Sequence, residues 1–73
     1  MSTLDSLPSG SRAIVHSVGA VDATMLRLLE MGLTENAVVV VTRRAPLGDP
    51  MEIEVRGTRL CLRREHARRF TVK

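Results

Sequence analysis

Apolar residues recur at strand spacing in some parts of the chain and at helical spacing in others. Ala13 and Val15 alternate with other side chains and predict a first strand. Residues 22–31 predict a short helix, because Asp22 is a good N-cap and apolar residues follow three and four positions apart. Gly32 is the residue type expected just after a helix, in a left-handed backbone conformation. The apolar stripe of this helix consists of Met25, Leu26, Leu28 and Leu29.

The second half of the chain has the pattern of short strands separated by turns. Residues 37–42 form a β-branched run, but its phase is ambiguous because 38–41 are all valine. Either Val38 and Val40 or Val39 and Val41 then lie outside the core. Alternation predicts two further strands that Gly57 joins, a single helical turn over 64–68, and core-closing residues after it. The inward positions of this part are Met51, Ile53, Val55, Leu60, Leu62, Ala67, Phe70 and Val72.

These elements predict a mainly β fold. About five short strands with one short α-helix between the first two indicate a small, strongly curved barrel. The length of 73 residues predicts a single domain that spans residues 1–73.

Charge is distributed unevenly along the chain. The net charge is +3, yet residues 1–41 carry two basic and four acidic groups, whereas residues 42–73 carry nine basic and four acidic groups. A basic C-terminal half favours an acidic partner, which could be nucleic acid, acidic lipid or an acidic protein surface. An arginine-rich, solvated surface is the alternative interpretation.

Several protein classes are disfavoured by composition. The longest apolar run, 37–41, is far shorter than the roughly 20 residues of a membrane span, and the N-terminus has no secretion signal. A lone cysteine, Cys61, cannot form an internal disulfide. We therefore expect a small cytoplasmic protein. Because Phe70 is the sole aromatic residue, the chain has no platform for stacking single-stranded bases.

Residues for catalysis or metal binding do not form a recognisable motif. The chain has no glycine-rich phosphate loop, nucleophile elbow or His-Glu-x-x-His motif. A metal site would require His16, Cys61, His66 and a carboxylate to converge from distant positions. We expect no enzyme activity, no cofactor and no bound metal. Cys61 falls in the outward phase of its strand, as an unreactive surface thiol.

Three segments together resemble the FeoA family, a small cytoplasmic component of the bacterial ferrous iron transport system. The most specific are E-M-G-L at 30–33 and A-P-L-G-D-P at 45–50, in this order and spacing. The resemblance continues through 53–67 and includes L-x-x-L-P-x-G at 4–10, so it covers nearly the whole chain.

The resemblance implies an SH3-like barrel that acts as an accessory protein of ferrous iron uptake. The partner it implies is FeoB, a membrane permease with a cytoplasmic GTPase domain, which would recruit the protein to the membrane. The same fold occurs as the C-terminal domain of iron-dependent repressors, but this chain begins without DNA-binding helices. A stand-alone relative of that domain and a small basic barrel that binds nucleic acid are the alternatives. No nucleic acid partner is expected, and the sequence leaves open whether the protein is a homo-oligomer.

The loop after the valine-rich strand is the predicted partner contact. Arg43 and Arg44 end that strand, Pro46 restricts the loop, and an apolar residue, Leu47, occupies a turn position. An apolar tip flanked by arginine is typical of a small interface anchor. The alternative is that Leu47 folds back onto the end of the barrel while the arginines are solvated. The predicted contact residues are Arg43, Arg44, Pro46, Leu47 and Asp49.

Overall fold

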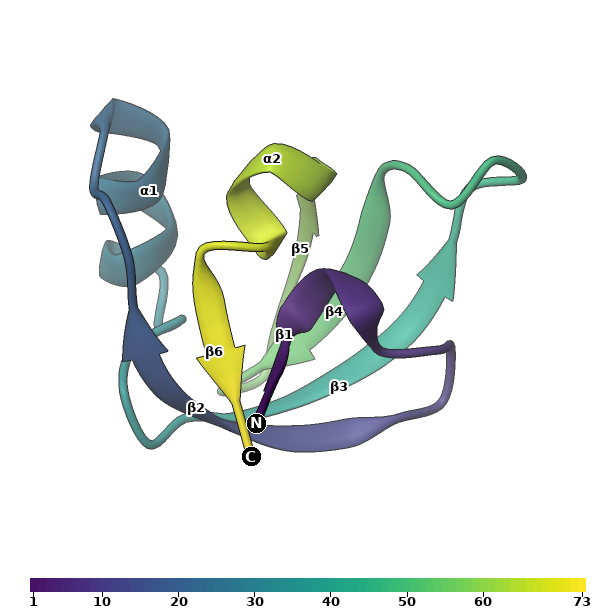
Figure 1. Ribbon diagram of the computed structural model, residues 1–73, viewed down its shortest axis with the longest axis horizontal. Coiled ribbons are helices and arrows are strands. Elements are labelled where there is room, and N and C mark those ends of the chain that lie inside the picture. The colour runs from purple at the N-terminus through teal and green to yellow at the C-terminus, as the bar shows by residue number, and fades with distance from the viewer.

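One antiparallel sheet of six strands wraps around the core (Figure 1). The computed structural model describes residues 1–73. The strands are β1 (Ser2–Thr3), β2 (Arg12–Val18), β3 (Val38–Arg44), β4 (Met51–Val55), β5 (Thr58–Leu62) and β6 (Phe70–Val72). A 3₁₀ turn, η1 (Leu4–Ser6), follows β1, and the two helices are α1 (Ala23–Glu30) and α2 (Arg64–Ala67).

The strand order is β1-β6-β2-β3-β4-β5, so the two ends of the chain meet at one side of the sheet. The sequence predicted about five strands, and the additional one is β1, which pairs with β6 through only two residues. An element this short shows no alternation that could be recognised. The predicted helix accordingly lies between β2 and β3.

Two irregularities in strand pairing bend the sheet. The register between β2 and β6 shifts between Val15 and Ser17, and the register between β3 and β4 shifts between Val41 and Arg43. A bulge of this kind increases local twist and changes the direction of the following side chains. Curvature at these points lets the sheet close around its own apolar face (Figure 1).

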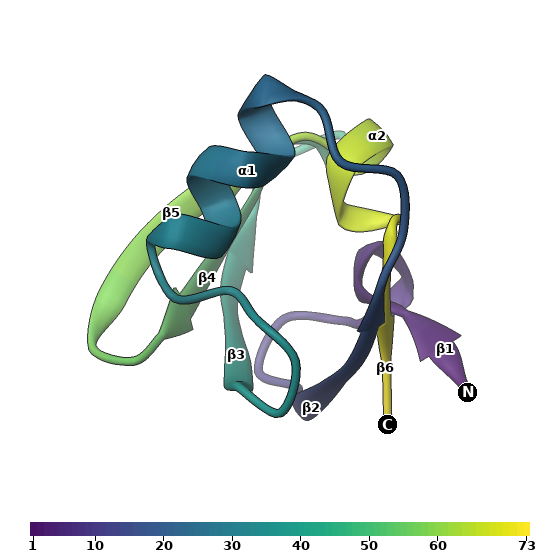
Figure 2. The ribbon, with the colours of Figure 1, turned by 90° about the vertical axis from the view of Figure 1, so that its left-hand side faces the viewer.

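All the fully buried side chains are apolar and form one cluster. Phe70 is completely buried, which confirms that the lone aromatic residue serves the core. Both helices and η1 contribute to the cluster, so they cover parts of the barrel that the strands leave open (Figure 2). Neither helix is long and apolar enough to cross a membrane. The core residues are Leu4, Ala13, Val15, Met25, Leu28, Leu33, Ala37, Val39, Val41, Met51, Ile53, Val55, Leu60, Leu62, Ala67, Phe70 and Val72.

The valine-rich strand has a defined inner and outer face. Val39 and Val41 are fully buried, whereas Val38 is 40% exposed and Val40 is half-buried. Val38 lies opposite Ile14 of β2, which is 39% exposed. The ambiguity of phase is thus resolved, and the outer face of β2 and β3 carries a narrow apolar strip.

Both predicted ends of α1 are confirmed. The side chain of Asp22 accepts a hydrogen bond from the Met25 N–H at 2.9 Å, as an N-cap does. At the other end Gly32 has φ 110°, and Leu33 donates its N–H to the Leu28 carbonyl at 3.1 Å. This last bond closes a Schellman motif, which ends the helix and directs the chain back to the core.

Asp22 also connects α1 to the C-terminal part of the chain. Its Oδ2 lies 2.9 Å from the Arg69 guanidinium and 3.5 Å from Nε2 of His66. The pKa of Asp22 is lowered from 3.8 to about 2, mainly because its carboxylate accepts the Met25 N–H and then because Arg69 donates to it. The ionised carboxylate therefore favours the folded state.

The contribution of the Asp22 charge to stability should depend on pH. Because the pKa is lowered on folding, the contribution is fully present above about pH 4 and is lost as the pH falls towards 2. Asp22→Asn keeps an N-cap acceptor but removes the charge. In thermal melts we expect the variant to melt below the parent at pH 6 and to approach it near pH 2. A difference that stays constant over this range would show that the charge is not responsible.

Candidate functional site

The loop between β3 and β4 is held in place from within and from outside. The Gly48 N–H donates to the Ala45 carbonyl at 2.7 Å, which closes the predicted turn around Pro46. The Ala45 N–H donates to the Pro50 carbonyl at 3.0 Å, across the base of the loop. Oδ1 of Asp49 accepts the backbone N–H of Arg64 at 2.9 Å, so the loop is also connected to the start of α2. The loop is therefore preorganised rather than free.

Leu47 stands at the tip of this loop and is 91% exposed. It is the most exposed large apolar side chain in the structure. Of the two arrangements that the sequence allowed, the structure has the projecting one, and Leu47 does not fold back onto the barrel. The turn has no need of an apolar residue at this position, since its hydrogen bonds use only backbone groups.

Arg43 is directed to the outer face by the bulge in β3. Strict alternation from Val39 and Val41 would direct it inward, but the shift in register places it opposite Glu52. Its side chain is 78% exposed, and its Nε lies 3.4 Å from a carboxylate oxygen of Glu52. The pKa of Glu52 is lowered, mainly by a hydrogen bond from the Thr42 hydroxyl and to a smaller extent by the charge of Arg43.

Arg44 has a structural position that the sequence did not reveal. We expected it to project beside the loop, but it is half-buried and faces the N-terminal segment. Its guanidinium donates to the carbonyl of Leu7 at 3.1 Å and to that of Gly48 at 3.0 Å, and also to the carbonyl of Asp5. Arg44 thus joins the first residues of the chain to the loop.

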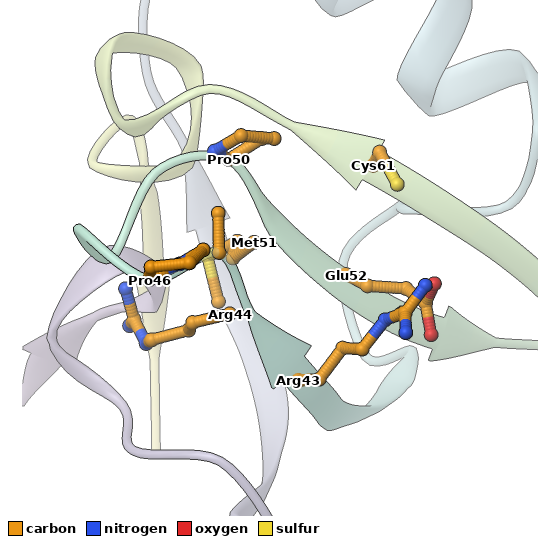
Figure 3. A pocket seen from close by; sticks show the side chains of 8 residues that line it. Arg43, Arg44, Pro46, Pro50, Met51, Glu52 and Cys61 are labelled. Atoms are coloured by element: carbon orange, nitrogen blue, oxygen red, sulfur yellow. Dashed lines mark ion pairs between the residues drawn. The ribbon is translucent and has the colours of Figure 1, made fainter.

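A hollow of about 290 Å³ opens beside the base of the loop. Figure 3 shows Met51 between two groups of side chains, with Arg44 and Pro46 on one side and Arg43 and Glu52 on the other. Cys61 of the neighbouring strand β5 is exposed, as predicted, and also lines the hollow. The hollow has room for a small side chain of a partner. It is formed by Arg43, Arg44, Ala45, Pro46, Pro50, Met51, Glu52 and Cys61.

The five predicted contact residues lie at one end of the barrel but differ in exposure and in hydrogen bonding. Leu47 and Pro46 are exposed on the loop, and Arg43 is exposed on the outer face of β3. Arg44 and Asp49 instead bind backbone groups. Glu52 was not among the predicted contact residues. The sequence favours a cross-strand ion pair for this carboxylate, and the structure shows one with Arg43.

The site offers no arrangement for catalysis. Nowhere in the chain do three His, Cys, Asp or Glu side chains gather in a way that could hold a metal ion. Nε2 of His66 lies 3.5 Å from the Asp22 carboxylate, whereas Cys61 lies opposite Glu52 in the sheet. What the site presents is a fixed apolar tip, an exposed guanidinium and a shallow hollow, which are features of a protein contact surface.

Comparisons with known proteins agree with this description. The model of the FeoA domain family matches residues 2–73. The solution structure of the FeoA protein from Chlorobium tepidum is 44% identical with a TM-score of 0.88, over 96% of this chain and 67% of that one. The crystal structure of Stenotrophomonas maltophilia FeoA complexed with zinc is 35% identical with a TM-score of 0.86, over 100% of this chain and 91% of that one.

A manganese-dependent transcriptional repressor shares the fold, with a TM-score of 0.85 and 18% identity over 99% of this chain and 40% of that one. None of the curated proteins matches the chain. The similar fold in a repressor agrees with the sequence resemblance but shows the architecture alone. The family match and the two FeoA structures go further and cover almost every residue. The chain therefore belongs to the FeoA domain family, as a non-enzymatic protein of SH3-like fold that is associated with ferrous iron transport.

Proposed function

We propose that this protein is an accessory and regulatory protein of ferrous iron uptake that binds the FeoB-type permease through the β3–β4 loop. The observation that carries the proposal is the position of Leu47, an apolar side chain that is 91% exposed on a loop fixed at both ends. A single exposed apolar side chain is ordinary on a protein surface. Leu47 is distinguished by its loop, which hydrogen bonds hold in place and whose base lines a hollow.

The rigidity of the loop favours binding. A segment that is already ordered loses little conformational entropy when a partner docks, so more of the contact energy appears as affinity. Pro46 and the hydrogen bonds of the turn supply this order at Leu47. The hollow beside the loop base extends the surface and could receive a side chain of the permease.

Charge on this side of the molecule favours an acidic partner surface. Arg43 is exposed, and the C-terminal half of the chain, to which the loop belongs, is basic. Complementary charge would increase the association rate and orient the encounter more than it would increase affinity. We expect an acidic patch on the part of the permease that faces the cytoplasm, which would hold this protein at the membrane.

The proposal is tested by Leu47→Ser in binding to the full-length permease in detergent, with and without guanine nucleotide. We expect the variant to bind about tenfold more weakly, since a central apolar anchor carries much of the binding energy of a small interface. Its Tm should stay within about 2 °C of the parent, because an exposed side chain contributes little to folding. Binding is measured by immobilising the permease and titrating the small protein.

Val38→Ser is the matched control. Val38 is 40% exposed on the outer face of β3, at the opposite end of that strand from the loop. We expect this variant to bind the permease as the parent does. If Leu47→Ser keeps both affinity and stability while Val38→Ser loses affinity, the contact lies on the outer face of the sheet. If the parent protein itself does not bind the permease at any concentration, the partner has been wrongly identified.

A further inference from the structure

The last strand of the sheet, β5, pairs with another strand on one side only. It pairs with β4 over its whole length and occupies the end of the strand order. The two strands are joined by the two-residue turn Arg56-Gly57, in which φ is 50° and 79°. Turns with positive φ at both positions match the twist of a hairpin and fix its register.

This register determines which backbone groups of β5 are unused. In a two-residue hairpin the flanking residues Val55 and Thr58 form a hydrogen-bonded pair, and such pairs then alternate along the strands. Leu60 therefore also faces β4, whereas Arg59 and Cys61 direct their N–H and C=O groups away from the sheet. No backbone hydrogen bond from a loop, turn or helix engages residues 58–62, and both Arg59 and Cys61 are exposed.

An open strand edge normally carries a feature that prevents unwanted pairing. Here that feature is positive charge, because residues 55–64 contain four arginines and no carboxylate. Arg56 is occupied at the end of α1, where its Nε donates to the Gly32 carbonyl at 3.1 Å. Arg59 and Arg63 lie within ion-pair distance of no carboxylate, although Glu54 is opposite Arg59 on β4. The Arg59 charge already helps to lower the pKa of Glu52, but both arginines are exposed and can contact a partner.

We propose that the free edge of β5 binds an extended acidic segment of another protein as an added strand. Backbone groups of Arg59 and Cys61 supply the hydrogen bonds. One residue of the added strand lies opposite Cys61. Carboxylates two positions before and two positions after that residue pair with Arg63 and Arg59. Apolar residues at the alternate positions lie beside the buried side chains of Leu60 and Leu62. The inference is independent of the proposed function, since the segment need not belong to the permease.

A second copy of this chain is a poor occupant of the same edge. Antiparallel pairing centred on Cys61 places Arg59 of each copy opposite Arg63 of the other, and like charges directly opposite each other destabilise a sheet. No other register supplies a carboxylate, because residues 55–64 have none. The edge therefore selects against self-association and in favour of an acidic strand.

The test uses the whole chain and a blocked synthetic peptide, Thr-Val-Glu-Val-Ala-Val-Glu-Val-Thr, labelled for fluorescence anisotropy. We expect saturable binding, and protection from hydrogen exchange of the Arg59 and Cys61 amides, which exchange rapidly in the free protein. The double variant Arg59→Glu with Arg63→Glu should weaken binding about tenfold or more. A peptide with lysine in place of both glutamates should not bind.

The control variant changes the net charge equally at a distance from the edge. Arg12→Glu with Lys73→Glu alters two exposed residues at β2 and just after β6, and we expect it to bind the acidic peptide as the parent does. Equal losses in both double variants would mean unspecific attraction of charge and overturn the proposal. The proposal would also be overturned if the peptide bound without protecting the Arg59 and Cys61 amides, or if these amides were already protected in the free protein. Absence of binding at millimolar peptide would overturn it as well. So would a single-stranded oligonucleotide that displaces the peptide and protects these amides equally.

Discussion

Replacing Gly32 with valine is expected to lower the free energy of unfolding by about 2–3 kcal/mol. Gly32 has φ 110°, a backbone conformation that residues with a β-carbon rarely adopt and β-branched residues avoid most. The residue cannot relax to negative φ without breaking the bond from Leu33 to Leu28 that ends α1. In a chain of this size the loss corresponds to a Tm lower by roughly 10 °C or more, which thermal unfolding by circular dichroism would measure.

Crowding adds to this backbone strain. A β-carbon at Gly32 would lie 3.0 Å from Cδ of Arg56 and 3.5 Å from its Cβ. The Arg56 side chain would have to move, and its bonds to the Gly32 carbonyl and to the Thr34 hydroxyl would be lost. These bonds connect the end of α1 to the turn between β4 and β5, so α1 would lose one of its attachments to the barrel.

Gly10→Val is the control that separates strain from crowding. Gly10 also has positive φ, at 89°, but a β-carbon there would meet nothing within 4 Å. We expect Gly10→Val to be destabilising, but less than Gly32→Val. Equal losses would show that backbone strain acts alone at both positions. An unchanged Tm for Gly32→Val would mean that α1 does not end at this glycine in solution.

The features of the fold that depend on local sequence were predictable. Asp22 and Gly32 mark the ends of α1 because caps use groups within a few residues of each other. The hairpin of β4 and β5 was equally clear, since its apolar residues alternate strictly on both sides of Gly57. Asn36 in the turn before β3 adopts φ 70°, a conformation that asparagine tolerates better than most residues.

Features that depend on distant partners were not predictable. The bulge in β3 follows from how β3 pairs with β4, and no residue type near Thr42 predicts it. The bulge exchanges the directions that alternation predicts for Arg43 and Arg44, so the first is exposed and the second faces the N-terminal segment. Predicted as equivalent contacts, the two arginines have different surroundings.

The candidate site was located by sequence but not described by it. The sequence identified Leu47 as an apolar residue in a turn. Its exposure depends on whether the end of the barrel has a cavity in which the side chain can pack. The hollow beside it combines residues of β3, β4 and β5 that are up to eighteen positions apart. Likewise β1 forms only because β6 presents a free edge to two residues that carry no strand pattern of their own.

Arg44→Met is the second substitution for which we expect a large loss of stability, of about 2–3 kcal/mol. Methionine keeps the aliphatic part of the side chain but donates no hydrogen bond. The carbonyls of Asp5, Leu7 and Gly48 then lose a shared charged donor. Because η1 places Leu4 in the core next to these groups, loosening of the N-terminal segment also exposes apolar surface. Chemical unfolding would give the free energy, and faster amide exchange at Leu7 would locate the change.

Arg43→Met provides the comparison, since it removes the same charge one residue earlier. Arg43 is exposed and has a single ion pair with Glu52, so its loss should change the free energy of unfolding by less than about 0.5 kcal/mol. Arg44→Lys should recover little of the parent stability, because an ammonium group lacks the planar fork with which the guanidinium reaches carbonyls on two segments. If Arg44→Met and Arg43→Met were equally mild, the N-terminal segment would be held by Leu4 and the pairing of β1 with β6 alone, and Arg44 would be available to a partner as the sequence first indicated.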